Sequence, residues 1–349
     1  MVQQSPAMRF FELAMGPHDV LFSYISSREL VRLMRTCRRV NWLVHDTCFN
    51  LIRLLISFFG DALEVARFQR MQARSATLIS GSTALQFFNR LTYPGSDLDL
   101  YAHGPAAELP VRFLLSNGYT FDPRKSQDAD ALAQLPASVR DKGPSYLGRG
   151  IADVLDFHKG SKKIQLIIAE STPMETILSF HSTPVMNVLT HDRGYALYPR
   201  ATFETATALV IETVGAGQEL GRQKYVDRGW PMTAAASVSR DSELGVRMVR
   251  WVGDAFTWTL PLRPDAPRDL VPDLTCINSW KIDCNTTTTR THWAMLKHPE
   301  LRYKYIIADV GAVEAIWDDV LDSPAPILDT ALYHAVLRYR ESTAGTCLE

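Results

Sequence analysis

One stretch, residues 78–101, limits what this chain can fold into more than any other. It reads LISGSTALQFFNRLTYPGSDLDLY and divides into three elements. The apolar residues within 76–79 predict a short buried strand that ends at Gly81-Ser82. Leucine and phenylalanine at helical spacing predict a helix over 83–91, and the Pro94-Gly95 pair ends it. A strand, a tight turn and a helix are therefore expected in direct succession.

The last part of this stretch, residues 97–101, alternates charged and apolar side chains. Residues two apart in a strand point to the same face, so Asp97 and Asp99 are predicted to stand side by side. Paired carboxylates on a rigid strand suit a hard cation such as Mg2+. Gly81 and Ser82, at the start of the expected helix, offer backbone N–H groups to a phosphate. The pattern favours a site for a metal ion and a phosphate.

The order strand, Gly-Ser, helix and Asp-x-Asp resembles the signature of the DNA polymerase beta-like nucleotidyltransferase superfamily. The matching positions are Gly81, Ser82, Asp97 and Asp99, and the segment between Ser82 and Asp97 is long for that signature. The resemblance implies an α+β fold with a mixed sheet and helices, Mg2+ at Asp97 and Asp99, and a nucleoside triphosphate as substrate at Gly81 and Ser82. An unrelated strand, turn and helix with a half-exposed edge strand is the alternative interpretation.

Two further strands are predicted at 151–158 and 163–169, joined by a turn. In the resembled superfamily a third carboxylate often lies on a strand next to the aspartate pair, and the matching position here is Gln165. Glutamine can hydrogen-bond, but it cannot act as a base or bind Mg2+ as strongly. Asp153 or Asp156 could replace that carboxylate if its side chain faces the pair. Lys163 and Arg200 are the candidates for holding a triphosphate.

The N-terminal residues 16–50 show short amphipathic helical patterns with a break at Ser26-Ser27. Their order resembles an F-box motif, in which Leu21, Leu30 and Leu33 take the apolar positions. The resemblance implies docking on the adaptor subunit of an SCF-type ubiquitin ligase. The alternative is a helical cap that packs on the next domain.

Length and composition restrict the remaining possibilities. The chain has 349 residues with a formal net charge of -1, which gives no overall attraction to nucleic acid or anionic lipid. Its five cysteines are irregularly spaced and suggest reduced thiols rather than disulfides or a zinc site. No secretory signal or membrane-spanning run of about 20 apolar residues is recognised in the sequence. These features predict a cytoplasmic or nuclear protein that does not bind membranes.

Three regions are predicted along the chain: an F-box-like helical module at 1–60, a nucleotidyltransferase-like domain at 61–204, and an α+β region at 205–349. The last region is expected to contain a β-hairpin, with strands at 247–252 and 255–260 around Gly253-Asp254. Helices are expected at 314–321 and 327–340. The N-terminal motif and residues 81–101, 163–167 and 196–204 together resemble a group of uncharacterised fungal proteins.

Two functional hypotheses follow from these patterns. In the first, the chain is a Mg2+-dependent nucleotide-binding protein that transfers a nucleoside monophosphate to an acceptor hydroxyl. In the second, it is a non-catalytic adaptor whose nucleotidyltransferase-like domain binds a partner while the F-box-like module recruits a ubiquitin ligase. The aspartate pair favours the first hypothesis, and Gln165 favours the second.

Overall fold

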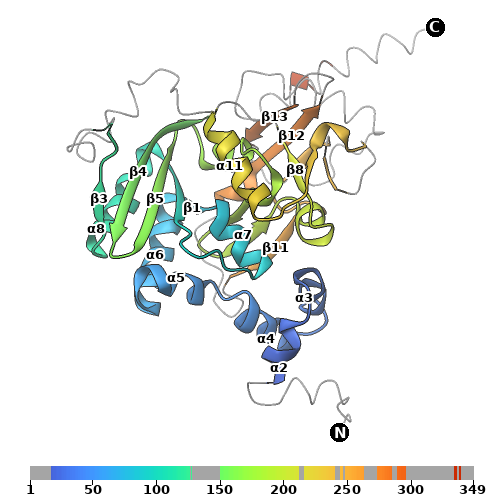
Figure 1. The fold of residues 1–349 in the computed structure, drawn as a ribbon, viewed down its shortest axis with the longest axis horizontal. Helices are drawn as coiled ribbons and strands as arrows, with labels where there is room; N and C mark the ends of the chain where they lie inside the picture. The colour runs from blue at the N-terminus through green and yellow to red at the C-terminus, as the bar shows by residue number, and fades with distance from the viewer. Residues whose placement is uncertain are drawn as a thin grey trace.

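The computed structural model describes residues 17–125, 127, 150–211, 216–239, 244–246, 248–262, 273–284, 289–295, 334–335 and 338. Over these residues the chain is a mixed α+β fold built on one large sheet, with helices packed against it (Figure 1). The coarse fold class predicted from the sequence is therefore confirmed. The helices expected at 314–321 and 327–340 fall outside the described residues, apart from the isolated positions 334–335 and 338.

Eight strands form the large sheet, in the spatial order β11-β7-β6-β1-β2-β5-β4-β3. Strands β2 and β5 run parallel, and the other neighbouring pairs run antiparallel. Parallel neighbours need a crossover, and here the chain passes through a helix and two strands between them. The strands are β1 (Leu78–Ile79), β2 (Leu98–His103), β3 (Thr120–Asp122), β4 (Ile151–Lys159), β5 (Lys162–Ala169), β6 (Asn187–Leu189), β7 (Arg193–Ala196) and β11 (Trp258–Pro261).

The connection from β1 to β2 follows the local signals of the sequence. Ser80 has an extended backbone and precedes helix α7 (Gly81–Asn89), which ends at the left-handed residue Arg90. In β2 the alternating residues Leu98 and Leu100 are fully buried, which turns Asp99 to the opposite face. The predicted order of strand, Gly-Ser, helix and strand is confirmed, with the helix shifted by two residues toward the N-terminus.

One face of the sheet is covered by α5 (Leu51–Phe59), α6 (Ala62–Ser75) and α8 (Glu108–Ser116). The side chains of Asn50 and Asp61 accept backbone hydrogen bonds and cap α5 and α6. The rings of Phe59, Phe68 and Phe113 have centroids 4.6 to 5.5 Å apart. Together with the apolar side chains of β2, β4 and β5 they form one continuous core, which holds the strands of the site rigidly.

The N-terminal helices α2 (Pro17–Ser23), α3 (Ser27–Leu33) and α4 (Arg38–Cys48) gather at one end of the molecule (Figure 1). Ser26 and Glu29 form a capping box at the start of α3, as the sequence break indicated. Arg90, at the end of α7, donates hydrogen bonds to the carbonyl oxygens of Phe22 and Ile25. Leu30, expected on the docking face of an F-box, is fully buried and belongs to the core shared with the sheet.

The segment Arg38–Phe59 is long and apolar enough, by length and composition, to cross a membrane, although the sequence was expected to contain no such segment. In the structure it is not one helix but two, because the chain breaks at Phe49 and Asn50 between α4 and α5. Leu43, Val44 and Leu55 of this segment are buried in the core next to the sheet.

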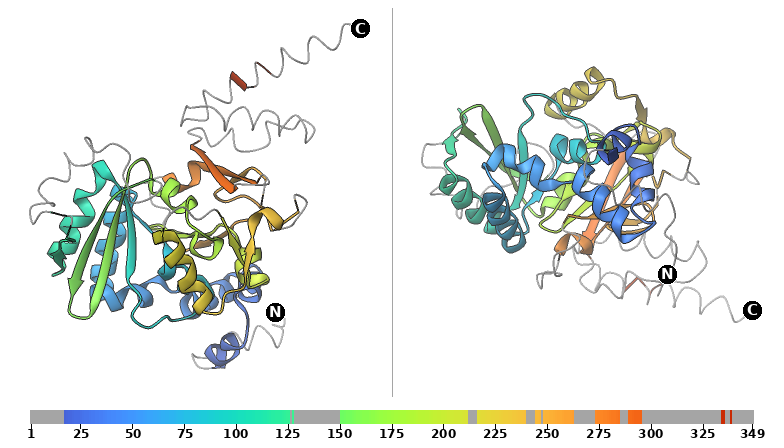
Figure 2. Two further views of the ribbon diagram at one scale, coloured as in Figure 1. Left: turned by 45° about the horizontal axis from the view of Figure 1, so that its top comes forward. Right: turned by 90° about the horizontal axis from the view of Figure 1, so that it is seen from below.

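The opposite face of the sheet carries a second core, centred on Trp280, whose indole N–H donates to the Tyr198 hydroxyl at 2.7 Å. Figure 2 shows this part from two further sides. The remaining helices and strands are α10 (Pro173–Leu178), β8 (Ala208–Val210), α11 (Ala216–Asp227), β9 (Met232–Ala234), β10 (Arg250–Trp251), β12 (Asn278–Cys284) and β13 (Thr289–Met295). Short 3₁₀ turns lie at Gly104–Ala106, Thr183–Val185, Ala235–Ser237 and Leu274–Ile277, and a π turn lies at Arg200–Glu204.

The hairpin predicted around Gly253-Asp254 is wrong. The strand before this turn, β10, pairs with β12, whereas the strand after it, β11, pairs with β7 of the large sheet. Within this turn the Arg250 guanidinium donates to the Asp254 carboxylate, and it also donates to the Leu197 carbonyl oxygen next to β7. The hairpin of this region is formed by β12 and β13 instead. Since β11 joins β7, the large sheet uses residues from both sides of position 204.

Candidate functional site

The start of α7 and the carboxylate of Asp99 meet at the centre of the sheet. Gly81 has a φ of +66°, and a Cβ at this residue would lie 2.6 Å from Asp99 Oδ2. The Ser80 backbone N–H donates to the Asp99 carbonyl oxygen at 3.3 Å, and the Ser80 hydroxyl donates to Asn187 O at 2.6 Å. Only glycine therefore combines this backbone conformation with such close approach of the helix start to the carboxylate.

Asp97 is close enough to Asp99 for its charge to affect the ionisation of Asp99. Burial raises the pKa of Asp99 to about 7, and the charge of Asp97 adds to this effect. The charges of Lys224 and Lys163 act in the opposite direction but do not cancel it. Asp97 stands just before β2, and its carbonyl oxygen accepts a hydrogen bond from the Thr83 hydroxyl at 3.0 Å. Burial, rather than the charge of Asp97, is therefore the main cause of the raised pKa of Asp99.

Gln165 occupies the predicted position beside the aspartate pair. In the register of β2 with β5 it is the partner of Asp99, and in the register of β5 with β4 it is the partner of Asp156. Its amide Nε2 donates to Asp156 Oδ1 at 2.7 Å. Asp99, Gln165 and Asp156 therefore form a row across three neighbouring strands, with the amide between the two acids.

The Asp156 carboxylate is held by several donors. Arg124 Nε and Nη2 lie 2.8 and 3.3 Å from its two oxygens, and Lys163 Nζ lies 3.4 Å from Oδ1. Burial opposes its ionisation, but the hydrogen bonds from Arg124 and Gln165 outweigh burial and lower the pKa of Asp156. The group is ionised at neutral pH, with both oxygens already engaged.

Asp153, the other replacement considered for the third carboxylate, has its own partners. Its Oδ1 accepts hydrogen bonds from Gln127 Nε2 at 2.7 Å and from the Val154 backbone N–H at 2.8 Å. Within the described ranges, no group of three or more histidine, cysteine, aspartate or glutamate side chains is arranged to hold a metal ion.

Lys163 and Arg200 were the two side chains expected to hold a triphosphate. Lys163 lies beside Asp97, whereas Arg200 lies against Phe256. Lys163 Nζ is 3.9 Å from Asp97 Oδ2 as well as 3.4 Å from Asp156. The Arg200 guanidinium lies over the ring of Phe256, 5.4 Å from its centroid. Lys163 is therefore the stronger candidate of the two for binding an anion next to the pair.

Helix α11 contributes to the site, although nothing in the sequence pattern indicated it. Its weak apolar periodicity gives no helical signal in the sequence. Lys224 is near enough for its charge to lower the pKa of Asp99. The pKa of the buried Tyr101 hydroxyl is raised by burial, by Asp99 and by Tyr225 of the same helix. Tyr225 packs with Leu85 of α7, so α11 closes the side of the site next to that helix.

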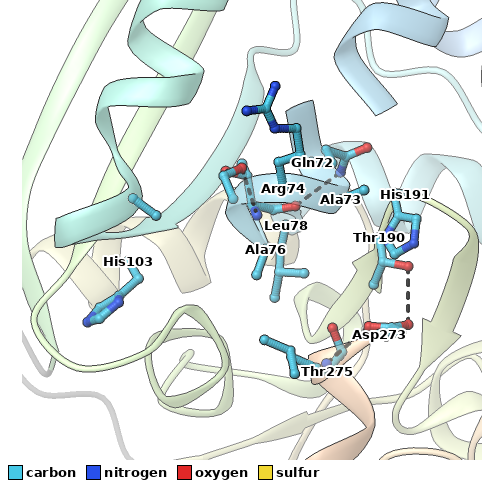
Figure 3. Close-up of a pocket in the computed structure, with 14 residues that line it drawn as sticks. Gln72, Ala73, Arg74, Ala76, Leu78, His103, Thr190, His191, Asp273 and Thr275 are labelled. Atoms are coloured by element: carbon cyan, nitrogen blue, oxygen red, sulfur yellow. Dashed lines mark hydrogen bonds between the residues drawn. The ribbon is translucent and has the colours of Figure 1, made fainter. Parts of the chain in front are cut away.

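Two cavities of similar size lie at opposite ends of β2. One, of about 410 Å³, is lined by Asp97 and Lys163 and so opens beside the aspartate pair. The other, of about 420 Å³, reaches His103 at the far end of the strand and is shown in Figure 3 with Thr190 hydrogen-bonded to Asp273. Its lining residues do not include Asp97 or Asp99, so this second cavity is separate from the candidate site.

Comparisons with protein-family models, with curated proteins and with solved structures found no match for this chain.

Proposed function

We propose that the chain is a Mg2+-dependent nucleotide-binding protein and that its site is built from Gly81, Ser82, Asp97 and Asp99. The observation that carries the proposal is the close approach of the α7 start to the Asp99 carboxylate, 2.6 Å for a Cβ at Gly81. A helix start attracts phosphate and a carboxylate pair attracts a divalent cation. Because the two lie together, a Mg2+–triphosphate complex complements both at once.

The donors present fit a hard divalent cation. Asp97 and Asp99 supply oxygen ligands. The pKa of Asp99 is raised to about 7, chiefly by burial and further by the charge of Asp97, so a bound cation would favour its ionised form. Mg2+ commonly binds through one or two protein carboxylates together with substrate phosphates. When bound, Mg2+ would neutralise charge on the phosphates. The chain's own residues would position the triphosphate: the N–H groups of Gly81 and Ser82 by hydrogen bonds, and Lys163 and Lys224 by charge.

The resemblance to nucleotidyltransferases implies a reaction in addition to nucleotide binding. This reaction is the transfer of a nucleoside monophosphate with release of pyrophosphate. It needs a group to receive the proton of the acceptor hydroxyl. Gln165 cannot receive it, and Asp156 is ionised but bound by Arg124, Gln165 and Lys163. We therefore propose nucleotide binding as the main activity and expect transfer to be slow.

A thermal unfolding series tests the binding proposal. The wild-type chain should gain stability with Mg2+ and ATP together, by about 2.7 kcal/mol when the ligand is at a hundred times its dissociation constant. Asp99→Asn should remove this gain. Asp122→Asn is the control, because that carboxylate is 68% exposed on the edge strand β3. An unchanged melting temperature of the wild type with Mg2+ and each of the four triphosphates would contradict the proposal.

The adaptor role remains a second candidate, and the exposed face of α2 favours it. Val20 and Leu21 of α2 are 62% and 38% exposed, and Tyr24, directly after the helix, is 85% exposed, which is unusual for neighbouring apolar side chains. Leu30 is fully buried and cannot contact a partner without rearrangement. A docking surface for the ubiquitin-ligase adaptor would therefore use α2 rather than α3.

A pull-down with the purified adaptor subunit distinguishes this candidate. Tyr24→Asp should abolish capture if α2 is the docking surface, whereas Leu63→Asp should not. Leu63 is the control because it is an apolar residue of α6 that is 66% exposed. Failure of the wild-type chain to capture the adaptor would leave α2 and α3 as a helical cap.

A further inference from the structure

The cavity beside Asp97 is built by segments that are distant in the sequence. With a volume of about 410 Å³, it falls within the size range of small-molecule sites. Its walls come from α5, from α7, from residues 92–97 between α7 and β2, and from Ser161 with the start of β5. Residues 92–97 belong to the segment that is long for the nucleotidyltransferase signature. Residues 92–97 therefore help to enclose a space next to the candidate metal site.

The charges in this cavity favour an anion. Its charged lining residues, among those described, are Asp97, Lys162 and Lys163. Lys163 is shared between Asp97 and Asp156, at 3.9 and 3.4 Å. Lys162 Nζ lies 5.5 Å from the centroid of the Phe58 ring, and within the described part of the chain it forms no ion pair. An ammonium held over an aromatic ring without a carboxylate partner is suited to bind phosphate as a point charge.

The uncharged lining favours a ligand with hydroxyl groups. It includes the hydroxyls of Ser57, Thr83, Thr92 and Ser161 and the amide of Gln86. Thr83 and Ser57 are fixed by donating to the Asp97 and Leu54 carbonyl oxygens, at 3.0 and 2.9 Å. Each hydroxyl oxygen can still accept a hydrogen bond through its lone pairs. The wall therefore presents at least two fixed acceptors, the hydroxyl oxygens of Thr83 and Ser57, to a ligand that carries O–H donors.

We propose that this cavity binds a small phosphorylated polyol, with its phosphate at Lys162 and its hydroxyl groups extending along the serine and threonine wall toward Asp97. Because Asp97 lines both sites, this ligand would lie next to the nucleotide as its second substrate. That role rests on the proposed function. The binding itself rests on the cavity and on Lys162, and can be measured separately.

Isothermal titration of the full chain with ribose 5-phosphate, glucose 6-phosphate and glycerol 3-phosphate tests the proposal. At least one of these should bind about tenfold more tightly than either the unphosphorylated polyol or inorganic phosphate. Lys162→Gln should weaken that binding about tenfold and leave the binding of Mg2+–ATP unchanged. Lys159→Gln is the matched control, because Lys159 pairs with Lys162 across the hairpin but donates to Asn117 O at 2.6 Å.

A second variant blocks the cavity without altering its charge. Ser57 is exposed on α5, so Ser57→Trp should fill the space without disturbing the core and should abolish binding of the polyol phosphate. The proposal would be overturned if none of the three polyol phosphates bound. It would also be overturned if Lys162→Gln and Lys159→Gln bound the polyol phosphate with equal affinity, or if saturating Mg2+–ATP displaced the polyol phosphate. Binding through Lys162 in a chain that does not bind ATP would support this site and contradict the proposed function.

Discussion

Gly81 lies directly against Asp99, so that a Cβ on the glycine would be 2.6 Å from the aspartate Oδ2. The start of α7 and the Asp99 carboxylate can approach this closely because residue 81 has no side chain. A change at residue 81 should affect the position of the carboxylate as well as the backbone.

We predict that Gly81→Ala costs about 1 to 2 kcal/mol of stability through its positive φ, and in addition displaces the Asp99 carboxylate. The affinity of the folded chain for Mg2+–ATP should therefore also fall, because the Asp99 carboxylate has moved. Gly160→Ala is the matched control, because Gly160 has a φ of +58° and nothing within 4 Å of a Cβ. Chemical denaturation and ATP titration of both variants measure the two effects. Equal ATP affinity in both variants would show that the contact with Asp99 has no role in binding.

The pKa of Asp99 predicts a dependence of stability on pH. Its value of about 7 in the folded chain exceeds the ordinary 3.8, so the folded state binds more protons between these values. Stability in the absence of metal should fall as pH rises from about 4 to about 7, by on the order of a few kcal/mol. Urea unfolding at pH 5 to 8 checks this, with Asp99→Asn as the comparison. If the stability of Asp99→Asn falls with pH as much as that of the wild type, the pH dependence comes from other groups.

Mg2+ binding should show the opposite trend. The cation requires the ionised form of Asp99, so its affinity should rise as pH increases from 6 to 8. Below pH 7 each bound ion should release about one proton. Titration calorimetry in buffers of different ionisation enthalpy measures the proton count. An affinity that stays constant over this range would place Mg2+ at another site.

Gln165→Glu should place a third carboxylate in register with Asp99. We expect Mg2+ to bind about tenfold more tightly and nucleotidyl transfer to become detectable with labelled triphosphates. Without Mg2+ the variant should be less stable by about 1 to 3 kcal/mol, because the amide donor to Asp156 is replaced by a like charge. Gln223→Glu is the control, since that amide also donates to an aspartate, Asp227, but on the exposed side of α11. Equal transfer rates in the two variants would exclude Gln165 as the missing base position.

The ion pair between Arg250 and Asp254 should be essential for the C-terminal half of the fold. Their side chains are 1% and 3% exposed, and the guanidinium lies 5.1 to 5.3 Å from the ring centroids of Tyr198, Phe256 and Trp280. Arg250→Met should destabilise the chain by about 3 to 5 kcal/mol, because Asp254 would remain buried without its partner. Arg112→Met, at a pair that is 74% and 60% exposed, should cost less than about 1 kcal/mol. Similar unfolding midpoints for both variants would contradict this ranking.

The part of the site formed by neighbouring residues could be predicted from the sequence. Strand, glycine turn, helix and alternating strand each leave a local pattern. Gln165 was matched to the aspartate pair through the resembled superfamily, and the register of β2 with β5 makes it the partner of Asp99. The same local reasoning misplaced the hairpin at Gly253-Asp254. A tight turn predicts a reversal of the chain, but it cannot show that the two flanking strands join different sheets.

Contacts between distant segments had no such signal. The hydrogen bond from Arg124 to Asp156 and the position of Lys224 near Asp99 depend on tertiary packing. The burial of Leu30 likewise depends on the core that the N-terminal helices share with the sheet. Amphipathic spacing predicts that one side of a helix is apolar, but not whether that side faces a partner or the same chain.

The parallel pairing of β2 with β5 has a consequence for how the site assembles. Asp99 and Gln165 are neighbours in the sheet, although the chain between them contains α8, β3 and β4. The closing of such long connections slows folding, because entropy is lost before the contacts form. The helix start and the aspartates can be in place early, since they are close in sequence. The row of Asp99, Gln165 and Asp156 is therefore completed late, and a nascent chain that ends before β5 would carry only half of the site.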